Sequence, residues 1–357
     1  MKETLRPTSP PLPQTPLDTE DQFYAFLAGG ARHQLLLSAV DLGLDKLLSA
    51  GPLPLAEIIV QLGLDATRAD KWMSLLVGVG LCELVLDPHG GIPSYAAAPL
   101  LLAMAAPDLA GGYFYREFLR YWRASIVHDT VGVVKGAPVL YPVRYPPTDV
   151  ADTKLLHEWM RSGALLTLAS LEKYFDFSWT KHLLDVGGGD ATMACALTKK
   201  HPRLKVTVFN VPQAADLARS NIAAAGVGDR VKVVVGDFRV DALPRGFDTV
   251  LFSRVLADWP PDLCQKLINE AYASLTPDGV LVVCEPLRDQ NFELSIAWEH
   301  SYLPYDDFGA HTYKTTELYE WMMAVSGFGE LTRHPRRESI HGAIVARKLP
   351  QAGSGGR

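Results

Sequence analysis

Apolar and polar positions alternate along the second half of the chain in two different rhythms. Short runs rich in valine, leucine and phenylalanine are separated by longer stretches in which apolar residues recur at helical spacing. The runs predict buried strands, and the longer stretches predict amphipathic helices. Alternating strands and helices are typical of a doubly wound parallel sheet, whose ligands bind at the carboxyl ends of the strands. The predicted strands are 183–185, 205–209, 231–235, 247–254 and 280–285.

The first half of the chain has the helical rhythm without the buried strands. Apolar positions predict a long helix over 22–43 and two further helices over 55–62 and 68–79. A turn at 87–91 between two short apolar runs predicts a hairpin after these helices. This order of elements is typical of a winged helix-turn-helix.

Shifts in composition suggest where the parts of the chain begin and end. The first residues are rich in proline and have little to bury, so we expect them to be disordered, and we expect the same of the last residues. The predicted parts are a lead over 1–20, a helical domain over 21–110, a helical connector over 111–180, a sheet domain over 181–348 and a tail over 349–357.

The segment 185–189, Asp-Val-Gly-Gly-Gly, follows the first predicted strand. Glycines lack the Cβ atoms that would hold a ligand away from the backbone, and the next helix directs its positive end to the same place. The loop has neither the G-x-G-x-x-G spacing of a dinucleotide site nor the Gly-Lys-Ser/Thr of a phosphate loop. It therefore favours an adenosyl-containing cofactor.

Residues after the next two strands suit the rest of such a cofactor. Asn210 ends the second strand about twenty residues beyond the glycines, where a side chain can hydrogen-bond ribose hydroxyls. Asp237 and Phe238 follow the third strand and offer a carboxylate for an amino group and a ring for an adenine face. Two more polar groups, Ser253 and Glu285, end the fourth and fifth strands.

The balance of charge disfavours nucleic acid as a partner. Non-specific affinity for DNA comes largely from lysine and arginine on phosphates. The net charge of the chain is −6, and acidic residues outnumber basic ones in 53–86, the segment predicted as a winged helix. A DNA-binding regulator is therefore a disfavoured alternative.

Composition also argues against a membrane or metal protein. No run of apolar residues is long enough to cross a bilayer, and the first residues lack the apolar core of a signal peptide. The four cysteines show no C-x-x-C spacing and the ten histidines no H-x-x-x-H pattern, so we expect no metal. We expect a cytoplasmic enzyme in a reducing compartment.

Five motifs in order from Asp185 to Glu285 resemble the class I S-adenosylmethionine-dependent O-methyltransferases of plant phenolics and bacterial natural products. They are Asp-Val-Gly-Gly-Gly at 185–189, Val-Pro at 211–212, Gly-Asp-Phe at 236–238, Leu-Ala-Asp-Trp at 256–259 and the strand that ends in Glu285. The resemblance implies S-adenosylmethionine as the cofactor. It implies cofactor contacts from Asp185, Gly187, Gly189, Asn210, Val211, Asp237, Phe238, Ser253 and Trp259.

The resemblance also implies an α/β fold of two domains. A Rossmann-like class I methyltransferase domain would follow an all-α winged-helix dimerisation domain, and the enzyme would be a homodimer. Segments 328–334 and 342–345 look like the antiparallel hairpin that closes the methyltransferase sheet, after a helix over 315–325.

Two positions depart from the family pattern. Asn210 stands where the family has an acidic residue on the ribose, and Ala257 stands where it has the catalytic histidine that removes the acceptor's proton. Because an unperturbed phenol is mostly protonated at neutral pH, a base is expected to contribute about 10²–10⁴-fold to its methylation. We expect a substitute base at Glu285, or at His300 or His311 in the histidine-rich segment 298–313.

The missing histidine leaves several reactions open. Transfer of the methyl group to a hydroxyl of a small, aromatic secondary metabolite is the first. Methylation of an electron-rich ring carbon is the second, and a reaction that uses S-adenosylmethionine without methyl transfer, such as decarboxylation, hydroxylation or rearrangement, is the third.

The acceptor site is predicted from the resemblance. A helix over 153–174 carries Met160 where the family places a methionine near the reacting methyl group. The segment after the fifth strand lies where the family closes the substrate pocket. We expect acceptor contacts from Met160, Trp298, Glu299 and Tyr302.

Overall fold

The computed structural model describes residues 19–86, 91–105, 115, 116, 119, 130–137, 150–289, 292–303, 313–336 and 340–349, without the side chains of 150–159, 162, 292, 301 and 302. The chain divides into two compact units, one over 14–124 and a second that contains 125–357. The predicted lead and tail lie almost wholly outside the described residues, as does the predicted turn at 87–91 except for its last residue.

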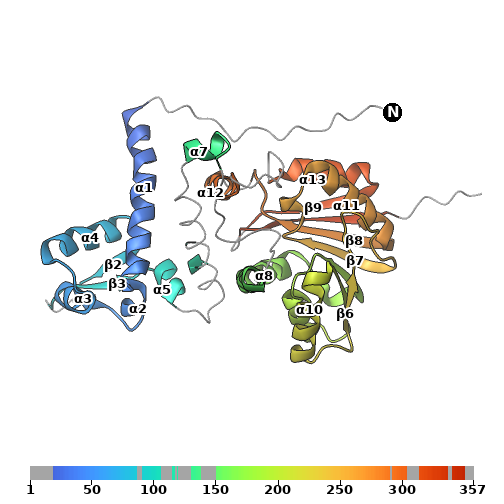
Figure 1. Cartoon of the computed structure of the whole chain (residues 1–357), viewed down its shortest axis with the longest axis horizontal. Helices are drawn as coiled ribbons and strands as arrows, with labels where there is room; N and C mark the ends of the chain where they lie inside the picture. The colour runs from blue at the N-terminus through green and yellow to red at the C-terminus, as the bar shows by residue number, and fades with distance from the viewer. Residues whose placement is uncertain are drawn as a thin grey trace, which may run out of the picture. The chain divides into compact units, whose positions relative to one another are not determined.

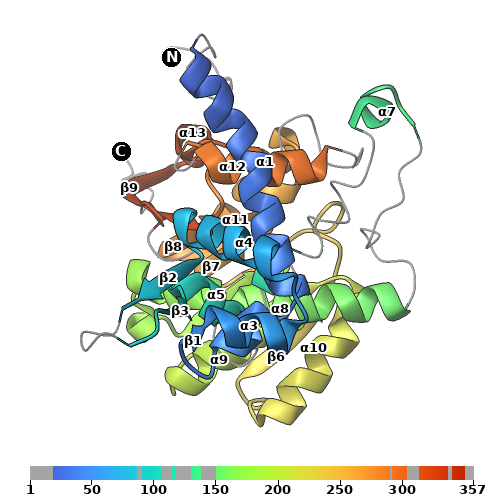
Figure 2. The same cartoon turned by 90° about the vertical axis from the view of Figure 1, so that its left-hand side faces the viewer.

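The N-terminal unit contains the predicted helices and a small sheet (Figures 1 and 2). Its short strands pair antiparallel in the order β1-β3-β2, so that a hairpin follows helices α3 and α4. The elements are α1 (Glu20–Asp41), α2 (Leu44–Leu48), β1 (Leu53–Pro54), α3 (Leu55–Leu62), α4 (Ala66–Gly78), β2 (Cys82–Val85), β3 (Ser94–Ala97) and α5 (Pro99–Ala105).

The first helix has the ends that its sequence predicts, to within two residues. Thr19 and Gln22 form a capping box, in which each side chain accepts a hydrogen bond from the other residue's backbone N–H. Gly43 has a φ of +79°, so the chain turns there instead of continuing the helix. The helix predicted over 22–43 is therefore α1, and the short helix α2 that follows Gly43 was not predicted.

The second unit begins with helices and continues as the predicted alternation of strands and helices (Figure 1). The elements before and within the first half of the sheet are α7 (Thr130–Val134), α8 (Val150–Tyr174), η1 (Phe177–Trp179), β4 (His182–Val186), α9 (Thr192–Lys200), β5 (Lys205–Asn210), α10 (Pro212–Ala225) and β6 (Val231–Val235). Those that follow are β7 (Phe247–Ser253), η2 (Leu256–Asp258), α11 (Pro261–Ser274), β8 (Leu275–Glu285), α12 (Phe292–Tyr302), α13 (Thr316–Val325), β9 (Phe328–His334) and β10 (Gly342–Lys348).

The seven strands form one sheet in the order β6-β5-β4-β7-β8-β10-β9. Strands β4 to β8 are parallel, and β10 pairs antiparallel with both β8 and β9, which confirms the predicted hairpin. Gly342 lies opposite Glu285, so the start of β10 lies at the carboxyl ends of the parallel strands.

Alternate residues of the central strands pack on opposite faces of the sheet, as the period of a strand requires. Leu184, Val250 and Val283 pack in one core with side chains of α11 and α13. Leu183, Leu251 and Val282 pack in a second core with side chains of α8, α9 and α10. The sheet is therefore the middle of three layers, and its carboxyl edge is open for a site. No helix of the described part is long and apolar enough to cross a bilayer.

Candidate cofactor and acceptor site

The glycine-rich loop after β4 has no room for side chains at two of its three glycines. Gly187 has a φ of +70°, and a Cβ atom there would lie 2.9 Å from Val255 Cγ2. A Cβ atom at Gly188 would overlap the carboxylate of Asp185. Gly189 has a φ of +56° and open space beside it. The loop can therefore bring its backbone close to a ligand, as a cofactor cradle must.

Asp185 lies beneath this loop and is 3% exposed. Burial disfavours its charged form and raises its pKa to about 7. A ligand that brings positive charge to the loop would stabilise the ionised carboxylate. The site therefore has an electrostatic preference for a cationic group beside its backbone cradle.

Asn210, the predicted ribose residue, joins β5 to the glycine-rich loop. Its Nδ2 donates to the carbonyl of Gly189 at 2.9 Å, and its Oδ1 accepts from the backbone N–H of Val211 at 2.9 Å. A carboxylate at this position has no N–H to donate to the Gly189 carbonyl. The asparagine thus holds the loop in a way that the acidic residue of the family pattern does not.

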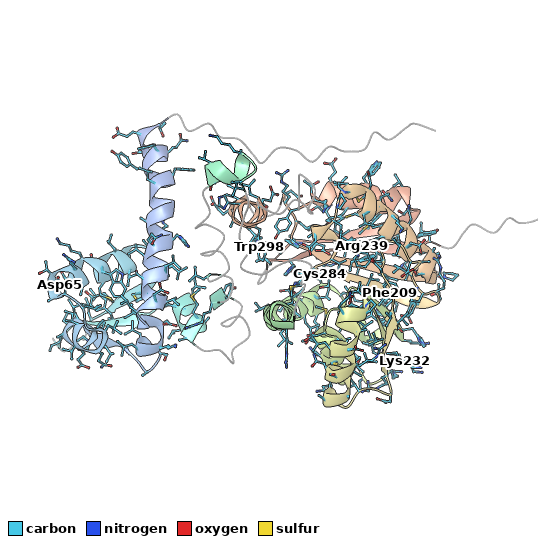
Figure 3. All side chains as sticks on the ribbon, viewed as in Figure 1. Asp65, Phe209, Lys232, Arg239, Cys284 and Trp298 are labelled. Carbon is cyan, nitrogen blue, oxygen red and sulfur yellow. The ribbon has the colours of Figure 1, made fainter. Side chains whose placement is uncertain are left out.

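The residues predicted near an adenine form one cluster with the loop. The rings of Phe238 and Trp259 meet edge to face with centroids 5.6 Å apart, and a Cβ atom at Gly187 would lie 3.7 Å from Phe238 Cε1. Arg239 donates from Nη2 to Asp237 Oδ2 at 2.7 Å and lies over the Trp259 ring, 5.8 Å from its centroid. The Arg239 hydrogen bond lowers the pKa of Asp237, so this carboxylate is ionised and can accept hydrogen bonds from a ligand. Figure 3 labels Arg239 and also Phe209, the last residue but one of β5.

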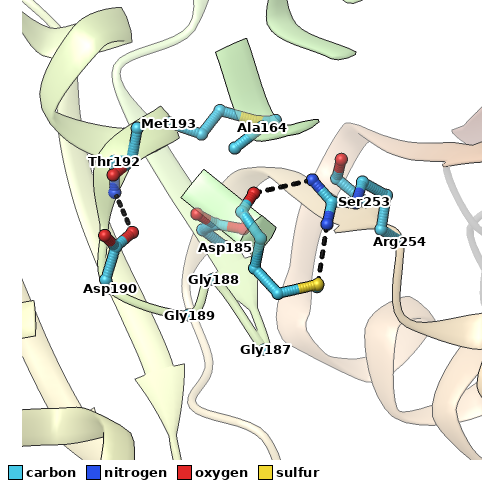
Figure 4. Close-up of a pocket in the computed structure, with 11 residues that line it drawn as sticks. Ala164, Asp185, Gly187, Gly188, Gly189, Asp190, Thr192, Met193, Ser253 and Arg254 are labelled. Atoms are coloured by element: carbon cyan, nitrogen blue, oxygen red, sulfur yellow. Dashed lines mark hydrogen bonds between the residues drawn. The ribbon is translucent and has the colours of Figure 1, made fainter. Parts of the chain in front are cut away.

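A pocket opens between this loop, the end of β7 and helix α8 (Figure 4). Arg254 donates to the Met160 carbonyl oxygen at 2.9 Å and to its sulfur at 2.8 Å, and Arg254 is the only cation among the described lining residues. Ser253 Oγ is buried and has no hydrogen-bond partner among the described residues. The lining residues are Met160, Ala164, Asp185, Gly187, Gly188, Gly189, Asp190, Thr192, Met193, Ser253 and Arg254.

The short turn after β7 is held from both sides by two buried ionisable residues. Glu285 at the end of β8 accepts at Oε1 from the backbone N–H groups of Val255 and Leu256, at 2.8 and 2.9 Å. Lys314 donates from Nζ to the carbonyl oxygens of Leu256 and Ala257, at 2.9 and 2.8 Å. Ala257 lies in this turn and is 3% exposed. Because four hydrogen bonds fix the turn, its side chains have defined positions at the edge of the site.

Comparisons with known proteins agree with this geometry. The O-methyltransferase domain model matches residues 126–301. The 3-hydroxy-5-methyl-1-naphthoate 3-O-methyltransferase of Streptomyces sahachiroi is 30% identical over 262 residues, which are 72% of this chain and 74% of that protein. The chain belongs to the O-methyltransferase family.

Two further relatives extend the comparison. The L-tyrosine C(3)-methyltransferase of Streptomyces lavendulae is 29% identical over 289 residues, which are 77% of this chain and 76% of that protein. The crystal structure of the S-adenosylmethionine-dependent methyltransferase SibL in its apo form has 27% sequence identity and a TM-score of 0.76, and it covers 92% of this chain and 99% of that one. This chain is thus an enzyme, a methyltransferase with S-adenosylmethionine as its cofactor, and a DNA-binding regulator is not favoured.

The site of this methyltransferase fits S-adenosylmethionine. The glycine cradle admits a ligand close to the backbone, and the pocket beside it presents an orphan hydroxyl, that of Ser253. Asp185 lies where the positive charge of the cofactor would favour its ionised form, and Arg254 offers a cation for the cofactor's carboxylate. When bound, the cofactor supplies an electrophilic methyl group.

The predicted acceptor and base residues have different environments in the methyltransferase. Trp298 is buried on α12 with its ring centroid 6.4 Å from that of Tyr313. Glu299 forms an ion pair with Arg288, with Oε1 2.8 Å from Nε, and so has a cation partner already. His300 is exposed on the same helix. His311 and the side chain of Tyr302 lie outside the described residues.

A buried histidine that no local sequence pattern indicates lies at the carboxyl edge of the sheet. His341 precedes β10 and is 5% exposed, and its Nδ1 is 3.2 Å from Thr167 Oγ1 on α8. Because Thr167 donates its hydroxyl proton to the Gly163 carbonyl, Nδ1 must be the donor in that contact, so the proton is on Nδ1. Burial and the charge of Arg254 lower the pKa of His341 well below its ordinary value. His341 is therefore a neutral residue that joins β10 to α8.

Proposed function

We propose that this methyltransferase transfers a methyl group to a hydroxyl of a small aromatic metabolite. The pocket between the glycine-rich loop and Met160 of α8 carries this proposal, because it lies at the carboxyl edge where both cofactor and acceptor must meet. The relative named for 3-O-methylation of a hydroxynaphthoate supports an aromatic hydroxyl as the acceptor. The buried pair of Trp298 and Tyr313 supports a flat acceptor, since acceptor pockets of this kind are mostly apolar.

We infer the roles of the site residues from their positions. Gly187 and Gly189 would hold the cofactor through their backbone, Asp185 through charge, and Phe238 with Trp259 through contact with its adenine. The remaining cofactor contacts would come from Asn210, Val211, Asp237 and Ser253, and the acceptor contacts from Met160, Trp298, Glu299 and Tyr302.

A homodimer is the assembly that we propose for the methyltransferase. Helix α1 exposes four large apolar residues, each at least half exposed, and such a patch is more apolar than a monomeric surface usually is. These residues are Phe23, Tyr24, Phe26 and Leu27. Analytical ultracentrifugation of the full chain tests the assembly, and a monomer at micromolar concentration contradicts it.

Methyl transfer is tested with S-adenosylmethionine labelled at its methyl carbon and a panel of hydroxynaphthoates and simpler phenols. Mass spectrometry of the products should show one added labelled methyl group, and NMR should place it on oxygen. A label on a ring carbon would overturn the O-transfer proposal and leave a C-methyltransferase. Conversion of an acceptor without transfer of the label would overturn methyl transfer itself.

A further inference from the structure

The structure provides a carboxylate next to the position where the histidine is missing. Asp258 follows Ala257 in the turn η2, four residues after Arg254, which lines the cofactor pocket. Strand β7 pairs with β4, so this turn and the glycine-rich loop leave the sheet from neighbouring strands. Asp258 therefore lies at the edge where the acceptor hydroxyl must approach the methyl group.

Glu285, the carboxylate that the sequence offers as a substitute base, is not placed to receive a proton from an acceptor. Glu285 has no exposed surface, and its Oε1 is occupied by two backbone N–H groups. Asp258 is partly exposed, and its carboxylate makes no hydrogen bond with any residue that the structure describes. A general base must be within hydrogen-bond reach of the proton that it removes. Of the two carboxylates, only Asp258 is accessible to an acceptor.

The turn also fixes the backbone from which the Asp258 side chain projects. Glu285 accepts from the N–H groups at the start of the turn, and Lys314 donates to the carbonyl groups of Leu256 and Ala257 just before Asp258. A catalytic group that is held by its surroundings loses less freedom in the reaction than a mobile one. In this chain the family's histidine position is an alanine, and the four hydrogen bonds hold the turn that contains it.

We propose that the carboxylate of Asp258 accepts the proton of the acceptor hydroxyl, in place of the histidine that the family has at position 257. This inference rests on the proposed function. The acceptor oxygen forms the new bond to the methyl carbon while the bond from that carbon to sulfur breaks, and sulfur retains the electron pair. The proton of the hydroxyl passes to Asp258, and the products are the methyl ether, S-adenosylhomocysteine and a neutral Asp258.

The charges that face Asp258 set its proton affinity close to that of a histidine. Burial raises the pKa of Asp258 to about 6, and Lys314 and Arg254 oppose that rise. Glu285, Tyr313 and Tyr319 also face this carboxylate, and the charge of Asp258 raises the pKa of Glu285. An unperturbed imidazole has a pKa of about 6.5. A partly buried aspartate therefore matches the proton affinity of the base that the alanine removes.

The test compares Asp258→Asn with the wild-type enzyme and with Asp216→Asn, a matched change at an exposed residue of α10. We expect Asp258→Asn to lower kcat by about 10²–10⁴-fold, the usual contribution of a general base. Its affinity for S-adenosylmethionine, from calorimetry, should stay within about threefold of wild type, because we assign this carboxylate no cofactor contact. Asp258→Glu, which keeps the carboxylate, should recover part of the lost rate.

Two readouts separate a base from a structural residue. The wild-type kcat should fall as the pH drops below about 6, and Asp258→Asn should lose that acid limb. Infrared difference spectra of the enzyme without substrates should show one carboxyl that titrates at about pH 6 in wild type and is missing from Asp258→Asn. An Asp258→Asn enzyme with more than about one third of the wild-type kcat and the same acid limb would overturn the role of Asp258 and leave methyl transfer standing. A wild-type enzyme that methylates no acceptor would instead overturn the proposed function.

Discussion

Glu285 offers a direct test of how the turn at the site is held. The side chain has no exposed surface and accepts two backbone hydrogen bonds at Oε1, while Oε2 has no partner among the described residues. Burial raises the pKa of Glu285 from 4.5 to about 8, although the two backbone hydrogen bonds oppose that rise. At neutral pH the residue is therefore mostly a neutral acid, and its acceptor oxygen, not its charge, stabilises the fold.

Two substitutions of Glu285 should change the free energy of unfolding by different amounts. Glu285→Gln keeps an oxygen acceptor for Val255 and Leu256, so the free energy of unfolding at pH 5 should change by less than about 1 kcal/mol. Glu285→Ala leaves both buried N–H groups without a partner, each at a cost of about 1–3 kcal/mol, and adds a cavity. At pH 5, where Glu285 is neutral in the folded protein, we expect Glu285→Ala to lower the free energy of unfolding by roughly 3–6 kcal/mol.

The stability that Glu285 provides should decrease as the pH rises. Because the folded state keeps a proton that the unfolded state has released, the contribution of Glu285 to stability is complete below pH 4.5 and is lost as the pH rises to about 8. At about 1.4 kcal/mol per pH unit, the loss is at most roughly 5 kcal/mol. Glu285→Gln has no such loss, so it should be more stable than wild type at pH 8.5.

Urea denaturation followed by circular dichroism at pH 5, 7 and 8.5 measures these differences. The expected result is that the stability of Glu285→Gln relative to wild type increases with pH, while Glu285→Ala is the least stable of the three at pH 5. If Glu285→Gln is as destabilised as Glu285→Ala at pH 7, the residue acts through its charge, and the account of the turn is refuted.

Three further substitutions probe the cofactor cradle and the turn. Gly188→Ala places a Cβ atom in the Asp185 carboxylate and should weaken S-adenosylmethionine binding at least about tenfold by calorimetry, so that unchanged affinity would show a cradle with spare room. Arg254→Gln removes the only cation among the described lining residues and should weaken cofactor binding by about 1–2 kcal/mol, whereas an unchanged dissociation constant would exclude a contact with the cofactor's carboxylate. Lys314→Met removes a charged donor from two buried carbonyl groups and should lower the free energy of unfolding by about 2–4 kcal/mol in urea; a variant as stable as wild type would mean that the turn holds without it.

Most of the sheet domain was predictable because its strands are short apolar runs that face helices on both sides. The predicted strand over 231–235 matches β6. In the N-terminal unit, the predicted helix over 55–62 matches α3. The break at Gly43 was predicted, but the five-residue helix α2 after it was not, because so short a segment shows no helical period of its own.

The site was predictable only where a local motif carries it. The glycine-rich loop and Asp237 with Phe238 lie in short segments whose chemistry is visible in the sequence. Lys314 is 1% exposed and acts on a turn nearly sixty residues away in the chain, so no local pattern indicates its role. His341 is likewise defined by its contact with Thr167, which is 174 positions away.

The proposed role of Asp258 requires that the acceptor hydroxyl contact the Asp258 carboxylate, with alanine at position 257. An experimental structure with S-adenosylhomocysteine and a bound hydroxynaphthoate tests it most directly. We predict the acceptor oxygen within about 3.2 Å of an Asp258 carboxylate oxygen, on the side that faces the sulfur of the cofactor product. An acceptor hydroxyl in contact with another titratable residue, with Asp258 turned away from it, would contradict the account.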